Sequence, residues 1–187
     1  MGELAQRRLE TAIGLFVSRR DRVSAITLAG AADGILHGLV LKAGKQPFAD
    51  YAIGVREALS GETPAKAKFA GHINDKLNIN DLKHMDEDGV DQVTFDPDIS
   101  ALGAILKAIA NHHILVPKHP DFINAMLQWT WMFYDGKQIT EDEPYVKPAG
   151  GNVMQRYADR PEEAKKMEER FAKKYQDLLK NTESNSD

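Results

Sequence analysis

The chain has 187 residues, enough for a domain with a hydrophobic core, and its 42% hydrophobic and 28% charged residues are ordinary for a globular protein. The net charge of −4 argues against a general nucleic-acid coat protein, and the absence of cysteine excludes disulfides, thiol catalysis and Cys-ligated zinc. The charged N-terminus lacks the apolar segment of a secretory signal, and no run of about 18 apolar residues predicts a membrane span. We therefore expect a cytoplasmic protein without a membrane partner.

Four helices are predicted in the first half of the chain. Apolar residues recur at three- and four-residue steps over 4–19, 24–43, 47–59 and 64–85. Gly44 and Gly61 end the second and third of these helices. Within the second helix Gly30, Gly34 and Gly38 lie one turn apart, although each costs about 1 kcal/mol relative to alanine. We interpret them as a groove for a closely packed helix; the alternative is scattered small residues in a buried helix.

The second half of the chain predicts three more segments. Asp96 followed by Pro97 is a typical helix start. The apolar face of that helix carries Ile99, Leu102, Leu106, Ile109 and His113. An aromatic-rich helix over 120–134 completes a bundle spanning 1–135, and glycine and proline predict a linker over 136–160. A charged helix over 161–180 would dock on the bundle or on a partner, and 181–187 is expected to be a disordered tail. The whole predicts an all-α fold, an antiparallel bundle of five to seven helices.

A row of polar residues marks the best candidate binding site. Lys76, Asn80 and His84 follow one another at four-residue steps and continue the apolar stripe of the fourth predicted helix. Polar groups that face inward cost free energy unless they are paired, so this row indicates a site. The alternative is that the helix ends near Leu77 and the row is only a loop.

Two further positions belong to the candidate site. Asp33 and His37 lie beside the glycine row and one turn apart, where they would bind a ligand, pair with each other or face water. A metal site is a separate alternative, since helical bundles hold metals with carboxylate and histidine side chains. Its candidate ligands are His72, Asp75, His84 and His113.

Three stretches resemble the HEPN superfamily of helical bundles: SAITLAGAADGIL (24–36), INDLKH (79–84) and ILKAIANH (105–112), within roughly residues 4–115. The resemblance implies a homodimer whose two motifs face each other across a cleft. Many members are RNases with an arginine, a following polar residue and a histidine. Asn80 matches the polar residue and His84 the histidine, but Ile79 stands where the arginine would be, and Lys76 is the nearest cation. Lysine lacks the planar fork that holds a phosphate, so the resemblance implies fold and dimer rather than RNase activity.

These observations lead to one main functional prediction. We expect an HEPN-like homodimer, non-catalytic or weakly catalytic, that binds RNA, a nucleotide or a protein partner in a cleft lined by Lys76, Asn80 and His84. No cofactor and no metal are expected. The alternatives are a metal-dependent helical-bundle hydrolase and a pure protein-interaction module that uses the glycine groove and the last helix.

Overall fold

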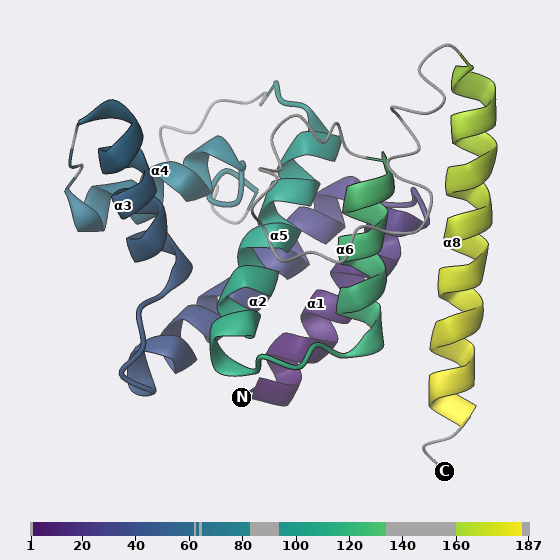
Figure 1. The fold of residues 1–187 in the computed structure, drawn as a ribbon, viewed down its shortest axis with the longest axis horizontal. Helices are drawn as coiled ribbons and strands as arrows, with labels where there is room; N and C mark the ends of the chain where they lie inside the picture. The colour runs from purple at the N-terminus through teal and green to yellow at the C-terminus, as the bar shows by residue number, and fades with distance from the viewer. Residues whose placement is uncertain (1, 62, 64, 83–93, 134–159, 185–187) are drawn as a thin grey trace. The chain divides into compact units, whose positions relative to one another are not determined.

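The computed structural model describes residues 2–61, 63, 65–82, 94–133 and 160–184. In these residues it has seven helices and no strand, which confirms the predicted all-α bundle: α1 (Gly2–Val17), α2 (Arg22–Lys42), α3 (Phe48–Ser60), α4 (Lys66–Lys76), α5 (Pro97–Leu115), α6 (Asp121–Phe133) and α8 (Pro161–Ser184) (Figure 1). The helices group into two compact units, Met1–His119 and Pro120–Asp187.

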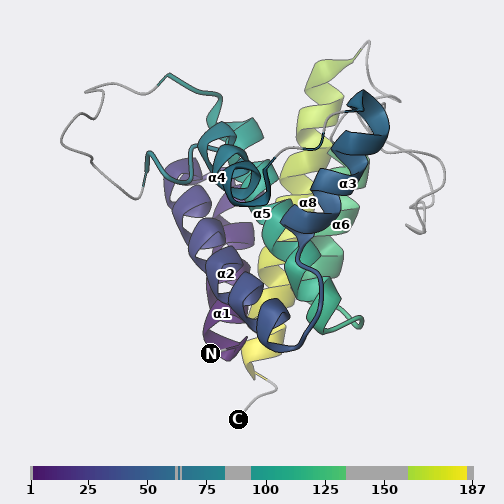
Figure 2. The same ribbon diagram turned by 90° about the vertical axis from the view of Figure 1, so that its left-hand side faces the viewer.

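The first unit is built on α1, α2 and α5, which lie side by side in both ribbon views (Figure 1, Figure 2). Small side chains let these three helices approach closely. The buried alanines are Ala5, Ala12, Ala25, Ala29, Ala32, Ala101, Ala104 and Ala108. Larger residues of α1, Leu9, Ile13 and Phe16, fill the remaining space and are at most 2% exposed. α2 is also the one described helix that is long and apolar enough to cross a membrane, a property that core helices share.

The helix ends follow the local sequence. The Asp21 carboxylate accepts a hydrogen bond from the backbone N–H of Ser24 at 2.9 Å and thereby caps α2. Hydrogen bonds from the Ser24 hydroxyl and backbone hold the pKa of Asp21 below its usual value. Asp96 caps α5 in the same way, with Pro97 in the first turn, so the predicted start of that helix is confirmed. Gly61 ends α3 at a φ of 71°, a conformation that glycine adopts without strain.

The fourth helix is shorter than predicted, because it ends at Lys76 instead of continuing to residue 85. Asn78 adopts a φ of 55°, which asparagine tolerates better than most residues. The N–H of Ile79 donates to the carbonyl of Asn74 at 2.9 Å and that of Asn78 to Asp75 at 3.0 Å. This pair of bonds is a Schellman motif, and the buried Ile79 anchors it. The polar row therefore leaves the helix after Lys76.

The buried face of α5 also differs from the predicted one. Ile99 is 58% exposed and His113 is exposed, although Leu102 and Ile109 are buried as expected. The face that packs on α1 and α2 instead carries alanines together with Ile105, and it includes polar side chains. Periodicity alone placed the centre of this face too close to the larger apolar residues.

In the second unit α6 packs on α8. The rings of Trp129 and Phe133 lie 5.6 Å apart, and Phe133 meets Phe171 of α8 edge-on at 6.1 Å. This pairing groups α6 with the last helix, whereas the predicted bundle extended to residue 135. α8 continues to Ser184, past the expected end at residue 180. The predicted linker, apart from Arg160, lies outside the described residues.

Candidate functional site

A buried polar network lies between α2 and α5. The Lys107 ammonium donates to Oδ2 of Asp33 at 2.6 Å, and both side chains are less than 10% exposed. The amide of Asn111, one turn further along α5, donates to Oδ1 of the same carboxylate at 2.7 Å. Both carboxylate oxygens thus have a donor, which is the condition under which a buried charge is tolerated.

The network also fixes the two short helices that flank α5. Lys107 donates a second hydrogen bond to the Asn74 side chain of α4 at 2.7 Å. Asn111 accepts from the backbone N–H of Phe48 at 2.9 Å and so satisfies a free donor at the start of α3. Asn78, just beyond α4, donates to Ser100 of α5 at 2.9 Å. α3 and α4 are therefore held against α5 by directional bonds.

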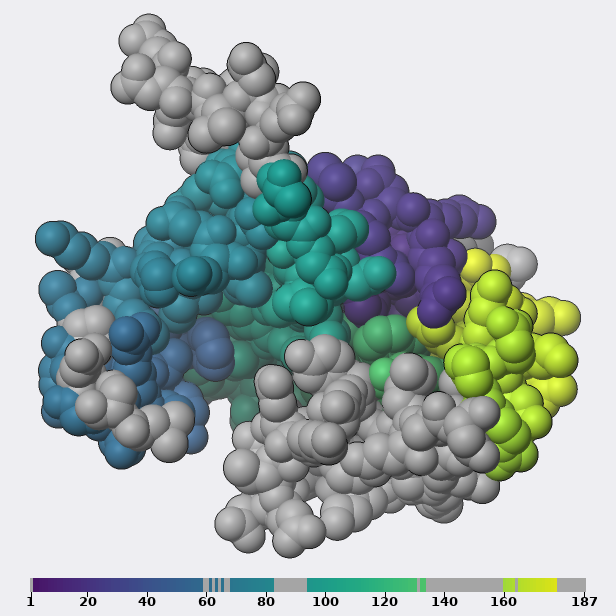
Figure 3. Space-filling model, turned by 90° about the horizontal axis from the view of Figure 1, so that it is seen from above, coloured from purple at the N-terminus to yellow at the C-terminus, as the bar shows by residue number. Residues whose placement is uncertain are grey.

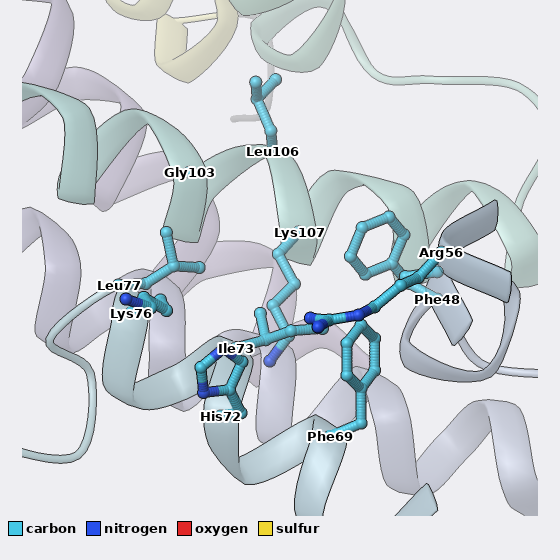
Figure 4. A pocket seen from close by; sticks show the side chains of 11 residues that line it. Phe48, Arg56, Phe69, His72, Ile73, Lys76, Leu77, Gly103, Leu106 and Lys107 are labelled. Atoms are coloured by element: carbon cyan, nitrogen blue, oxygen red, sulfur yellow. The ribbon is translucent and has the colours of Figure 1, made fainter. Parts of the chain in front are cut away.

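A cavity of about 510 Å³ lies between α3, α4 and α5, next to this network. Its walls are mainly apolar, and Lys107 contributes to its lining from α5. The apolar side chains are Phe48, Ala52, Phe69, Ile73, Leu77 and Leu106. Figure 4 shows the rings of Phe48 and Phe69 at one side of the cavity and Leu77 at the other. Its volume lies within the range of roughly 300–1,000 Å³ that is common for small-molecule sites.

Close packing shapes the end of the cavity near Leu77. A Cβ atom added to Gly103 would lie 2.4 Å from Cδ2 of Leu77, so a side chain on α5 at this point would displace that residue. At the other end the Arg56 guanidinium lies over the ring of Phe69, 5.8 Å from its centroid. Seen from above, the surface of α4 adjoins that of α5 (Figure 3).

The structure brings together only part of the predicted site. Lys76 lines the cavity and is exposed. Asn80 is half-buried, and its amide donates to Asp75 at 2.6 Å, while His84 lies outside the described residues. Asp33 pairs with Lys107 of α5 and not with His37, which lies one helical turn away on α2. His37 is half-buried and is not among the residues that line the cavity.

A histidine cluster lies at the end of α5. Nδ1 of His113 and Nε2 of His119 are 3.0 Å apart, and the rings of His112 and His119 are 5.9 Å apart. Burial lowers the pKa of His112, as do the neighbouring His119 and His113, and burial together with His113 lowers the pKa of His119. Over the part of the chain that the structure describes, no group of three His, Asp or Glu side chains is arranged to hold a metal ion.

Sequence reasoning missed Lys107, Asn111 and Asn74. The available signal was a charged residue in the middle of each of two apolar helices, away from the charged residues at their ends: Asp33 in α2 and Lys107 in α5, with opposite charges. Two buried residues of opposite charge each require a partner, and the simplest arrangement is that they pair with one another. No protein-family model, curated protein or solved structure matches this chain, so the site stands on its own geometry.

Proposed function

We propose that this protein is a non-catalytic binding protein that holds a small, largely apolar molecule in the cavity between α3, α4 and α5. The observation that carries the proposal is the mainly apolar cavity of about 510 Å³ beside a buried, hydrogen-bonded polar network. The hydrogen bonds of Asp33, Asn74 and Asn111 hold helices together, so these groups serve the shape of the site. A site whose shape is fixed before binding loses less free energy on ordering.

The cavity favours an apolar ligand over a nucleotide or RNA. The polar edge of a base would be buried against walls such as Phe48, Phe69 and Leu106, and unpaired polar groups are costly there. RNA binding in the manner of the HEPN resemblance would use Asn80, whose amide is bonded to Asp75, and His84. HEPN-like ancestry remains a proposal that rests on the sequence stretches and the helical bundle.

A filled cavity tests the proposal. Ala52 of α3 lines the cavity and is half-buried, so a phenyl ring at this position would occupy the space. We expect Ala52→Phe to weaken binding of the neutral, environment-sensitive dye Nile red by at least about tenfold. Ala58→Phe is the matched control, because Ala58 is exposed on the same helix. Equal dye binding by wild type and both variants, with unchanged circular dichroism, would show that the cavity is not the site.

The proposal includes a homodimer that uses the outer face of α2. A Cβ atom added to Gly34 or Gly38 would meet no atom within 4 Å, which leaves room for a second helix. Val23 and Leu41 of α2 are 46% and 52% exposed. We expect light scattering to give the mass of a dimer for the wild type and of a monomer for Gly34→Arg. A monomeric wild type at tens of micromolar protein would refute the dimer and leave the binding proposal unaffected.

A further inference from the structure

The charges around the cavity are unevenly distributed. Arg56, His72 and Lys76 line it and are exposed, whereas none of the lining residues within the described part of the chain is acidic. His72 and Lys76 lie four residues apart on α4 and so share one face of the helix. Figure 4 shows Arg56 extending between Phe48 and Phe69 toward His72. Among the described residues, the charged or titratable side chains at the exposed side of the cavity are therefore basic.

The inner side of the cavity carries no net charge. Lys107 lines it, but its ammonium is bonded to Asp33 at 2.6 Å and to Asn74 at 2.7 Å. The carboxylate neutralises this positive charge within the protein. A ligand anion placed at the inner side would therefore lose its hydration without gaining an unpaired cation. An apolar group placed there would instead contact apolar side chains and gain from burial.

We propose that the ligand is a single-chain amphiphile with one anionic head group, such as a carboxylate or a phosphate ester. Its apolar chain lies between Phe69 and Leu106, and its head remains at the exposed side beside Lys76 and His72. This inference rests on the proposed function, because it assumes that the cavity binds a small molecule. It adds the chemical class of the ligand and the direction in which the ligand enters.

Four ligands of eight carbons each test the head group: octanoate, octyl phosphate, octanol and octylammonium, titrated calorimetrically below micelle-forming concentrations. We expect an anion to bind about tenfold more tightly than octanol, since the Lys76 ammonium and the other basic side chains at the exposed side each add a modest attraction. Octylammonium should bind more weakly than octanol. Preference for octyl phosphate over octanoate would identify the phosphate ester as the head, and the reverse preference the carboxylate.

Two variants locate the head group. Lys76→Gln should reduce the preference for the anion over octanol to about threefold and leave octanol affinity unchanged. Lys68→Gln is the matched control, because Lys68 is an exposed lysine of α4 outside the cavity lining. Equal affinities for octanoate, octyl phosphate and octanol, all lost in Ala52→Phe, would overturn the head-group inference and leave the proposed function standing. If none of the four ligands binds and Nile red does not bind either, both the head-group inference and the proposed function would be overturned.

Discussion

Replacing Lys107 by methionine should cost the protein a large part of its stability. Methionine retains much of the apolar stem but removes the ammonium from a pair in which Asp33 is 8% exposed at its side chain. Of its two hydrogen bonds to described residues, Asp33 would then keep the one from Asn111 and lose the one that comes from its counter-charge. Breaking a buried ion pair in this way costs about 3–5 kcal/mol, against a total of roughly 5–15 kcal/mol for a folded domain.

Urea unfolding followed by circular dichroism measures this loss. With a slope of about 2 kcal/mol per molar urea, the midpoint should fall by roughly 2 M in Lys107→Met. Lys68→Met provides the control, since the same change at the exposed Lys68 should shift the midpoint by less than about 0.5 M. The double variant Asp33→Leu/Lys107→Met should recover most of the loss, because it removes both charges together. A midpoint shift in Lys107→Met no larger than that of the control would refute the buried pair.

Three further results are expected. The fold lowers the pKa of His112 and His119, so the unfolded chain takes up protons first as the pH falls below about 6.5, and the free energy of unfolding should fall with the pH. His112→Gln should therefore reduce the drop in melting temperature between pH 7.5 and 5.5. An equal drop in the wild type and the variant would contradict this. Gly54→Ala should stabilise α3 by about 0.4–1 kcal/mol in thermal unfolding, since its Cβ would meet no atom within 4 Å; a lower melting temperature would count against this packing. Gly103→Ala should show no such gain and should weaken octanol binding, because its Cβ displaces Leu77; unchanged binding would argue against that contact.

Local signals allowed most of the helices to be predicted. The start of α5 follows from Asp96 and Pro97, and the end of α3 from Gly61, because capping depends on a few neighbouring residues. The end of α4 was misplaced for a physical reason. Asn78 is a weaker stop signal than glycine, and the apolar residues beyond it continued the helical period in the sequence.

The candidate site could be predicted only in part, because its geometry depends on contacts between distant residues. Asp33 and Lys107 are separated by 74 positions in the sequence, and the residues that neighbour each of them do not indicate which distant residue is its partner. Helical spacing identified Lys76 as a site residue. Lys76 lines the cavity, but the predicted row of Lys76, Asn80 and His84 does not continue along one helix face, because α4 ends at Lys76. The basic edge of the cavity forms only when α3 and α4 are brought together.

The network around Asp33 has a consequence for binding that differs from its effect on stability. Buried charged groups often add little net stability over apolar replacements, but their hydrogen bonds hold helices in fixed positions. Lys107 bonds to Asn74 of α4, and Asn111 bonds to the backbone of Phe48 in α3. Both of these helices form walls of the cavity. The double variant Asp33→Leu/Lys107→Met removes the tie to α4 while it keeps an apolar core.

We therefore expect the free energy of unfolding of this double variant to lie within about 1 kcal/mol of the wild-type value. Its affinity for octanol should nevertheless be at least about fivefold lower. Calorimetric titration of octanol, with urea unfolding of the same protein samples, measures both quantities. Wild-type octanol affinity in a stable double variant would show that the network is not needed to shape the cavity. Weak binding together with wild-type stability would separate the positioning role of these buried groups from their contribution to folding.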